Sequence, residues 1–276
     1  MRAKRSLGQN FLVDPNAQRR IVEALEASAD DEVIEIGPGQ GALTRHLAGT
    51  VRRLTLVELD DELAAALAAE YAGRGDVVVV HRDVLETDIA SLLEDPARAK
   101  IVGNIPYNIT TPILFHLLDA RPRPERIVVM IQREVAERII AAPGGKTYGA
   151  LSVAIRAVAD VERVMQVKRG AFRPAPDVDS TVIRIRPRVP VPLGAEEEHD
   201  LRELTRAAFG RRRKQLGTIL RDAPEYALAP ADIERIGGSV GVAPDRRPET
   251  IDPPTFVALA RALRGIDRPR HLGASA

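Results

Sequence analysis

The first two-thirds of the chain alternates short apolar runs with amphipathic segments. The apolar runs have the length of buried strands, and the segments between them carry apolar residues at helical spacing. The predicted strands cover residues 33–36, 53–58, 77–80, 100–103 and 126–131. The predicted helices cover residues 42–48, 60–71, 111–118 and 134–141, after a first helix that begins at Asp14-Pro15. This order predicts an α/β fold with a parallel sheet covered on both faces.

The pattern changes after residue 150. Residues 151–187 have the pattern of strand after strand, which would extend the sheet with antiparallel members. A proline-rich linker at 187–192 and an acidic run at 196–198 follow, and helical patterns with turns come after them. With a boundary at 188–200, we expect an α/β domain over residues 1–190, a small α-helical domain over 200–265 and a disordered tail over 266–276.

Size and composition exclude several classes of protein. The 276 residues are enough for one large core and a small appendage. The chain has no cysteine, hence neither disulfides nor thiolate metal sites, and its five histidines show no i, i+4 pair, so we expect no metal. There is no apolar run long enough to cross a membrane, and no apolar segment follows the basic N-terminus. We expect a cytoplasmic protein and, without an evident exposed apolar stripe, a monomer.

The charge of the chain is unevenly distributed. The net charge is only +1, but residues 201–221 hold seven arginines and lysines and a single glutamate. The first twenty residues hold five basic side chains and one acidic side chain. Clustered charge on a near-neutral chain indicates a local phosphate-binding face, although a solvated helix face would show the same pattern.

A glycine-rich loop, residues 35–41 (EIGPGQG), follows the first predicted strand. Glycines in such a loop let a ligand approach the backbone closely, and nicotinamide, flavin and S-adenosylmethionine all use loops of this kind. The dinucleotide fingerprint has its third glycine three positions after the second, where this chain has Ala42. Glu35 can face the cationic end of a donor, whereas a pyrophosphate would gain nothing from a carboxylate. The loop therefore favours S-adenosyl-L-methionine.

Acidic residues follow the next two predicted strands. Glu58 ends the second strand, where a carboxylate can bind both hydroxyls of a ribose. Asp83 follows the third strand and could accept a hydrogen bond from the adenine amine of the donor. Each residue alone would usually be a helix cap or a surface carboxylate. Together with the glycine loop they predict one ligand site, because sheets of this type bind ligands at the carboxyl ends of their strands.

A corner with the sequence Asn104-Ile105-Pro106-Tyr107 follows the fourth predicted strand. The amide of Asn104 offers a hydrogen-bond acceptor, Pro106 stiffens the chain, and Tyr107 offers a flat face for a nucleobase. Such a corner can hold a planar amino group. With a methyl donor beside it, the pattern predicts an adenine amino-methyltransferase.

At this point the sequence resembles the rRNA adenine dimethyltransferases of the KsgA type over nearly its whole length. Residues 6–12 resemble the family's N-terminal donor-binding motif, and residues 104–108 (NIPYN) resemble its catalytic motif. Residues 146–149 with the strand expected at 151–153, and residues 172–180 (FRPAPDVDS), resemble two further motifs. Phe209 and residues 212–214 resemble its C-terminal basic helix, but the family usually has Arg and Asn at the positions of Gly217 and Thr218.

The resemblance implies a Rossmann-like class I methyltransferase domain and a helical rRNA-binding domain. It implies that two adjacent adenines in a hairpin near the 3′ end of 16S rRNA, in the small ribosomal subunit or its precursor, each receive two methyl groups. The implied donor contacts are Asn10, Leu12, Gly37, Glu58, Asp83 and Asn104. The implied catalytic residues are Asn104, Tyr107 and Phe172.

In this mechanism the Asn104 oxygen and the Ile105 carbonyl accept hydrogen bonds from the adenine amine, and Tyr107 stacks on one face of the base. Phe172 would cover the other face, or would instead anchor its loop in the core. Phosphate contacts are expected from the basic helix around Arg211, Arg212, Arg213 and Lys214, and from Arg2, Lys4 and Arg5.

Four other functions remain open. The first is a 23S rRNA adenine methyltransferase of the macrolide-resistance type, although the Val-Asp-Ser sequence at 178–180 and the basic run favour the small-subunit type. The second is a small-subunit assembly factor whose catalysis is secondary. A DNA adenine methyltransferase is disfavoured by Ile105, where those enzymes usually have Pro, and a nicotinamide oxidoreductase is disfavoured by the glycine spacing.

Overall fold

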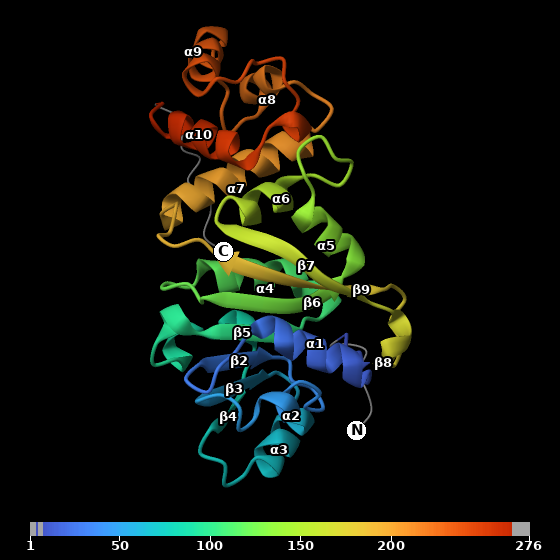
Figure 1. The fold of residues 1–276 in the computed structure, drawn as a ribbon. Helices are drawn as coiled ribbons and strands as arrows, with labels where there is room; N and C mark the ends of the chain where they lie inside the picture. Colours follow the sequence, from blue (N-terminus) through green and yellow to red (C-terminus); the bar gives the residue numbers. More distant parts are fainter. Residues whose placement is uncertain (1–3, 5–7, 267–276) are drawn as a thin grey trace. The chain divides into compact units, whose positions relative to one another are not determined.

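The computed structural model describes Lys4 and residues 8–266 of the chain (Figure 1). The chain divides into two compact units. Unit 1 consists of Met1–Ala136 and Asp160–Pro187, and unit 2 consists of Glu137–Ala159 and Arg188–Ala276. Unit 2 therefore includes residues 137–159, which the sequence analysis placed in the first domain. The predicted tail lies outside the described residues, apart from Ile266.

Unit 1 contains a seven-stranded mixed sheet with the strand order β4-β3-β2-β5-β6-β9-β7. The first five strands in this order are parallel, and β9 is antiparallel to β6. The predicted α/β class and the antiparallel extension of the sheet are both confirmed. The strands are β2 (Glu32–Ile36), β3 (Arg53–Glu58), β4 (Val77–His81), β5 (Lys100–Asn104), β6 (Arg126–Gln132), β7 (Ala159–Val167) and β9 (Ser180–Pro187). A second, two-stranded sheet pairs β1 (Phe11–Leu12) with β8 (Phe172–Arg173).

Both faces of the large sheet are covered by helices, which explains why its strands are nearly continuous runs of Val, Ile and Leu. On one face, strand side chains pack in a hydrophobic cluster with α1 (Pro15–Leu25), α2 (Thr44–Leu47) and α3 (Asp61–Glu70). α4 (Thr110–Asp119) buries its own apolar stripe, and Figure 1 shows it on the opposite side of the sheet from α1. This double burial gives unit 1 a rigid frame for a site at one edge of the sheet.

Two aspartates determine where α1 and α3 begin. Asp14 caps α1 by accepting hydrogen bonds from the backbone N–H groups of Asn16 and Ala17, and Asp60 caps α3 in the same way. A carboxylate at this position satisfies free N–H groups and interacts favourably with the helix dipole. Between residues 14 and 141 every predicted helix and strand is confirmed, with boundaries that differ by at most two residues.

One predicted strand is wrong. Residues 151–153 lie in helix α6 (Ala150–Arg156) rather than in a strand. The backbone N–H of Gly149 donates to the hydroxyl of Ser152 at 3.0 Å, which caps the first turn. Leu151, Val153 and Ile155 are all buried. A short segment that is buried on every side shows no amphipathic period, so its pattern does not distinguish a helix from a strand.

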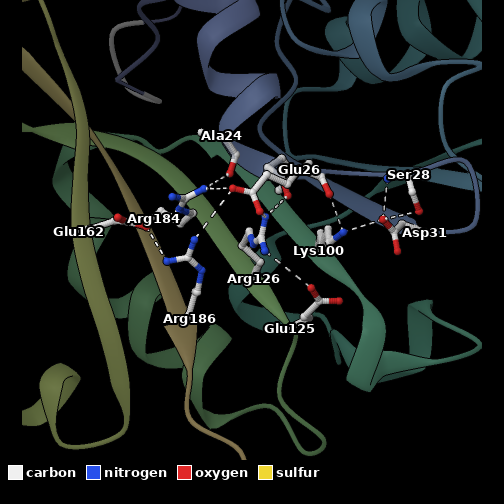
Figure 2. Close-up of polar contacts among 11 residues, drawn as sticks. Ala24, Glu26, Ser28, Asp31, Lys100, Glu125, Arg126, Glu162, Arg184 and Arg186 are labelled. Atoms are coloured by element: carbon white, nitrogen blue, oxygen red, sulfur yellow. Dashed lines mark hydrogen bonds and ion pairs between the residues drawn. The ribbon is translucent and has the colours of Figure 1, made fainter.

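A polar network ties the end of α1 to the sheet (Figure 2). Glu26, which ends α1 with a left-handed backbone, accepts hydrogen bonds from Arg126 of β6 and Arg184 of β9. Lys100, at the start of β5, donates to the carboxylate of Asp31 at 2.6 Å and to the backbone carbonyl of Glu26 at 2.8 Å. The network lies at the amino ends of the parallel strands, away from their carboxyl edge. Further members are Glu125, Glu162 and Arg186.

Unit 2 is helical over the part of the chain described. Its core includes the aromatic side chains of Tyr148, Phe209 and Phe256, with ring centroids 5.8 and 5.7 Å apart, and the Tyr148 hydroxyl donates to the Ile251 carbonyl at 2.7 Å. None of the helices over the described residues combines the length and apolarity needed to cross a membrane. The helices after the linker are α7 (Ala195–Gly210), α8 (Leu216–Asp222), α9 (Pro230–Val240) and α10 (Pro253–Arg264).

Candidate active site

The strand register brings the predicted site residues to one edge of the sheet. Ile36 of β2 pairs with Val57 of β3 and with Gly103 of β5. The residues that follow these three positions are Gly37, Glu58 and Asn104, so they lie side by side at the carboxyl ends of neighbouring strands. Gly103 allows this close packing, because a Cβ atom there would lie 2.7 Å from the Ile36 carbonyl oxygen.

A cavity of about 500 Å³ opens at this edge of unit 1. Its walls are the N-terminal segment 8–13, the glycine loop after β2, the ends of β3 and β4, and the corner after β5. Of the predicted donor contacts, the residues that line it are Asn10, Leu12, Gly37, Glu58, Asp83 and Asn104. The predicted donor residues are thus brought together in one cavity.

The glycine loop and Glu58 form one hydrogen-bonded element. Gly37 and Gly39 have φ values of 62° and 59°, a region that favours glycine. The backbone N–H of Gly39 donates to one Glu58 oxygen at 3.0 Å, and the N–H groups of Leu59 and Asp60 donate to the other oxygen at 2.9 Å. The carboxylate is therefore fixed in orientation, and the oxygen with a single donor keeps acceptor capacity for a ribose hydroxyl. This arrangement fits the predicted role of Glu58 in holding a nucleoside.

Glu35 is the most deeply buried acidic group of the cavity, with 1% of the residue exposed. The Thr44 hydroxyl donates to its carboxylate at 2.7 Å. Burial raises the pKa of Glu35 to about 7, and the Glu58 charge adds to this rise. A cation in the cavity would favour the charged form of Glu35, so the position fits a ligand that carries positive charge.

Asp83 lines the cavity while it also caps a short 3₁₀ helix, Val84–Glu86. One of its oxygens accepts the Leu85 N–H at 2.9 Å. The capping role and the predicted donor contact are compatible, because a carboxylate has two oxygens and several lone pairs.

The N-terminal segment is attached to the cavity by side-chain hydrogen bonds. Asn10 donates to the Gly8 carbonyl at 3.1 Å, and Gln9 donates to Asp60, the cap of α3, at 2.9 Å. Lys4 also pairs with Asp60, at 3.0 Å. Leu12 is buried in the hydrophobic cluster and pairs with Phe172 between β1 and β8. The predicted phosphate contacts Arg2 and Arg5, and the motif residues Ser6 and Leu7, lie outside the described residues.

The corner after β5 has one amide that is held in a defined orientation. The Asn104 Nδ2 group donates to the Asn10 backbone carbonyl at 2.9 Å. No residue in the described part of the chain donates to its Oδ1 atom, which remains available as an acceptor. The N–H of Ile105 is used by the Met130 carbonyl at 3.1 Å, which fixes the backbone of the corner to β6. Tyr107 is half-buried, lines the cavity, and its hydroxyl lies 2.6 Å from the Ser180 hydroxyl.

Phe172 does not lie where a stacking residue would. Its side chain is fully buried, belongs to the hydrophobic cluster on the α1 face, and does not line the cavity. A stacking role would require the ring to leave the core. The structure therefore supports the alternative role, an anchor that holds β8 against β1. The aromatic side chains that line the cavity are Tyr107 of the corner and Phe11 of the N-terminal segment.

The predicted basic helix is also placed differently. α7 ends at Gly210, and residues 211–214 form a turn before α8. Arg212 is held there by the carbonyls of Gly145 and Lys146, at 3.0 and 2.8 Å, whereas Arg213 and Lys214 are exposed. The low helix propensity of Gly210 explains the break in the helix. Arg211, Arg212, Arg213 and Lys214 line an open pocket of about 420 Å³ in unit 2.

Gly217 departs from the family pattern for a reason that the structure shows. A Cβ atom at Gly217 would lie 2.9 Å from the side chain of Pro244, and the Gly217 N–H donates to the Pro244 carbonyl at 2.8 Å. A larger residue would not fit without displacing Pro244. The structure shows no corresponding reason for Thr218.

The sequence analysis missed three residues that help to build the site, namely Ser180, Gln9 and Gly103. Ser180 was noted only as the end of a motif, Gln9 only as part of one, and Gly103 only as the end of a strand. Each acts through a partner far away in the chain: Tyr107, Asp60 and Ile36 respectively. Such pairs carry no local signal, although a serine between a proline-rich loop and a strand does indicate a polar group at the sheet edge.

Comparison with known proteins agrees with this site. A family model described as "Ribosomal RNA adenine dimethylase" matches residues 1–252. The chain is 42% identical over 270 residues to "Ribosomal RNA small subunit methyltransferase A" of Geobacillus thermodenitrificans, a match that covers 96% of this chain and 92% of the relative.

Two solved structures share the fold. A dimethyladenosine transferase from Plasmodium falciparum has a TM-score of 0.75 at 24% identity, covering 90% of this chain and 95% of the other. The 23S rRNA methyltransferase ErmE has a TM-score of 0.69 at 29% identity, covering 92% of this chain and all of the other. The Rossmann-like methyltransferase fold implied by the resemblance is therefore confirmed.

Proposed function

The chain belongs to the ribosomal RNA adenine dimethylase family, and we propose that it transfers methyl groups from S-adenosyl-L-methionine to two adjacent adenines in the 3′-terminal hairpin of 16S rRNA. The products are dimethyladenosines in the small ribosomal subunit or its precursor. The observation that carries this proposal is the Asn104 amide, which is held by the Asn10 carbonyl with its oxygen available at the wall of the cavity.

The donor cavity offers polar groups suited to each part of S-adenosyl-L-methionine. Glu58 would hold the ribose hydroxyls and Asp83 the adenine amine, while Gly37 lets the ligand approach the backbone and Asn10 and Leu12 form the wall of the N-terminal segment. The bound donor supplies a methyl group on a sulfonium, which is already activated. Glu35 lines the same cavity, and its carboxylate would accommodate the positive charge of the donor.

The corner after β5 would prepare the adenine amine for attack. An exocyclic amine is a poor nucleophile because its lone pair is delocalised into the ring. Hydrogen bonds to the Asn104 oxygen and the Ile105 carbonyl would favour a pyramidal nitrogen whose lone pair is directed at the methyl group. No strong base is required, and positioning of this kind can remove several kcal/mol from a barrier, up to about 7–11 in favourable intramolecular reactions.

Tyr107 would hold the base by stacking. A loop adenine must leave its own stack to enter the cavity, and an unpaired base is the least costly to extrude. Stacking on an aromatic ring contributes about 1–3 kcal/mol per base. Dimethylation further requires that the monomethylated amine still fit beside Asn104.

The rRNA would be gripped through its phosphates by the exposed basic side chains Arg213 and Lys214, with Arg211 and Lys4 as further candidates. Phosphate contacts position the RNA, whereas its shape and the extruded bases give specificity.

The rival function is methylation of 23S rRNA. The structure named for that activity is 29% identical to this chain, compared with 42% for the small-subunit relative, which favours the small subunit. A role as an assembly factor is compatible with the enzyme and would be separable from it if an inactive Asn104→Ala protein still binds particles.

The deciding experiment is transfer of labelled methyl groups to small subunits that lack these modifications, beside 23S rRNA. Dimethyladenosine confined to the small subunit is the expected result. Label in 23S rRNA would instead support the resistance-type activity. Binding of the donor with no label in either RNA would overturn the proposed function.

A further inference from the structure

We propose that Ser180 is a positioning residue for Tyr107, and that the segment 172–180 serves the active site through this hydroxyl rather than through the ring of Phe172. The inference rests on the proposed function, in which Tyr107 stacks on the target adenine. It assigns the proline-rich segment a part in holding the base, although its aromatic residue is buried in the core.

The contact is short and enclosed. The hydroxyl oxygens of Tyr107 and Ser180 lie 2.6 Å apart, within the range of a strong O–H···O hydrogen bond. Ser180 is fully buried. A buried hydroxyl that loses its hydrogen-bond partner carries the full cost of its desolvation. Burial raises the pKa of Tyr107, so its hydroxyl remains protonated and able to donate across the physiological range.

Ser180 is itself held in place by the sheet. It is the first residue of β9 and lies opposite Gln132, the last residue of β6. The residue before it is fixed from two directions. The backbone carbonyl of Asp179 accepts the Arg133 N–H at 3.0 Å, and its carboxylate accepts the Arg169 N–H at 3.1 Å. The serine hydroxyl is thus a rigid point at the edge of unit 1.

The tyrosine is consequently held at both ends. Its backbone belongs to a one-turn 3₁₀ helix (Tyr107–Ile109), and the Thr110 hydroxyl donates to the Pro106 carbonyl at 3.1 Å just before it. With the hydroxyl tied to Ser180, the long axis of the side chain is fixed between its own backbone and the start of β9 before a base arrives. A preorganised stacking surface lowers the ordering cost that binding would otherwise carry.

The loss of this bond should affect the positioning of the base and not the binding of the donor. Ser180 does not line the cavity, and its bond to the Tyr107 hydroxyl involves none of the proposed donor-binding residues Glu58, Asp83 and Gly37. A neutral hydrogen bond contributes about 1 kcal/mol net, which corresponds to about a fivefold change in kcat.

The test is a double-mutant cycle with Ser180→Ala and Tyr107→Phe in the full-length protein. We expect each single variant to lower kcat about fivefold, and the double variant to be no worse than either one. Donor affinity, measured by calorimetry, should stay unchanged. A hairpin RNA with 2-aminopurine at the target position should lose part of its stacking-induced quenching in both single variants, which a general loss of stability would not produce.

Thr181→Val is the matched control. Thr181 is the next residue of β9, is equally buried, and its hydroxyl has no hydrogen-bond partner within the described residues. This variant should retain full kcat and full quenching. If Ser180→Ala does not fold, Tyr107→Phe with the 2-aminopurine readout still tests the bond from the other side, because Tyr107 is only half-buried and the substitution keeps its ring.

Multiplicative losses in the cycle, or wild-type quenching in both single variants, would overturn the inference while leaving the proposed function intact. Failure of the wild-type protein to methylate the small subunit would overturn the proposed function and this inference with it. The two failures are therefore distinguished by the activity of the wild-type protein.

Discussion

Two carboxylates in the donor cavity differ in how their charge is compensated. Glu58 accepts three backbone N–H groups, whereas Glu35 accepts the Thr44 hydroxyl within an almost fully buried position. The other charged groups that act on Glu35 are Glu58, which raises its pKa, and Arg45, which lowers it. The net result is a group with a pKa of about 7, whose charge depends on what occupies the cavity.

We predict that donor affinity rises as the pH increases through about 7. A cationic donor stabilises charged Glu35, so binding releases a proton wherever the free protein holds one. Calorimetry between about pH 6 and 8, in buffers with different ionisation enthalpies, measures both the affinity and the released proton. Glu35→Gln should abolish this dependence, and Glu86→Gln, an exposed glutamate, should not. An affinity of the wild-type protein that does not change with pH would contradict the role assigned to Glu35.

The raised pKa of Glu35 also makes stability depend on pH, but in the opposite direction: stability falls where donor affinity rises. The pKa of Glu35 in the folded protein lies above its ordinary value of 4.5. The folded state therefore binds more protons than the unfolded state between about pH 4.5 and 7, and the contribution of Glu35 to stability falls as the pH rises through this window.

Asn10 is a proposed donor contact, whereas Asn104 is proposed both to contact the donor and to hold the adenine amine, so their variants should differ in the effect on kcat. Asn104→Ala removes the acceptor for the adenine amine, and we expect kcat to fall by at least about 100-fold. Asn10→Ala retains the backbone carbonyl that orients Asn104 but loses the bond to Gly8. This variant should weaken donor binding more than it lowers kcat. Steady-state kinetics with small subunits measures both, and a larger kcat loss for Asn10→Ala would argue against the assigned roles.

At the scale of elements, the connection between α1 and the sheet contains two kinds of ion pair. Lys100 and Asp31 are both buried, with 7% and 4% of their side chains exposed, whereas 52% of the Glu26 side chain is exposed. Removal of one partner from a buried pair leaves an uncompensated charge, while an exposed pair is screened by solvent. The two sites should therefore respond very differently to mutation.

We predict that Lys100→Ala destabilises unit 1 by about 3–5 kcal/mol, because it leaves the Asp31 charge buried. Glu26→Gln should cost at most about 1 kcal/mol, and less at high salt. Arg126 first, and Arg184 in addition, lower the pKa of Glu26 against its desolvation. Its contribution is therefore present above the unfolded pKa and is lost as the pH falls through the folded pKa. Urea unfolding at two salt concentrations tests both variants, and equal losses would contradict this distinction.

The elements also show what a sequence pattern can and cannot predict. Residues 53–58 form a strand as predicted because their apolar run is short and bounded by turns, and Glu58 was found because it ends such a run. The pattern misassigned residues 151–153, where burial on every side removes the helical period. The basic residues 211–214 were placed in a helix because they resemble the family's C-terminal basic helix, but here α7 ends at Gly210 and they form a turn.

For the molecule as a whole, local motifs indicated the cavity but not the network around it. Gly37, Glu58, Asp83 and Asn104 could be predicted because each ends or follows a strand, and the topology of a parallel sheet brings strand ends together. Asn10 and Leu12 were predicted only from the resemblance of the N-terminal motif. The positions of Phe172 and Ser180 could not, because both depend on a loop that pairs with distant strands. The two-unit division likewise depends on tertiary contacts, since residues 137–159 carry no linker at either end.

The proposed contact with rRNA phosphates depends on the exposed basic side chains of unit 2 and can be tested on the whole molecule. Arg213 and Lys214 are exposed in the turn after α7, while Arg212 is bonded to the carbonyls of Gly145 and Lys146. Replacing Arg213 and Lys214 together by Glu should weaken binding to small subunits and reduce the slope of log K against log salt by about one for each phosphate that is no longer neutralised. Donor binding should be unaffected, since the donor cavity belongs to unit 1.

Arg221→Glu is the matched control for this test, because Arg221 is an exposed arginine of the same unit whose side chain is paired with Asp222 at 2.8 Å. Arg212→Ala should instead lower the unfolding temperature, because it removes bonds that hold the turn to residues 145–146. Filter binding across a salt series, with thermal unfolding of each variant, separates these effects. If the Arg213 and Lys214 variant keeps the wild-type salt slope, the turn does not contact phosphate, and the RNA must be held by other basic side chains.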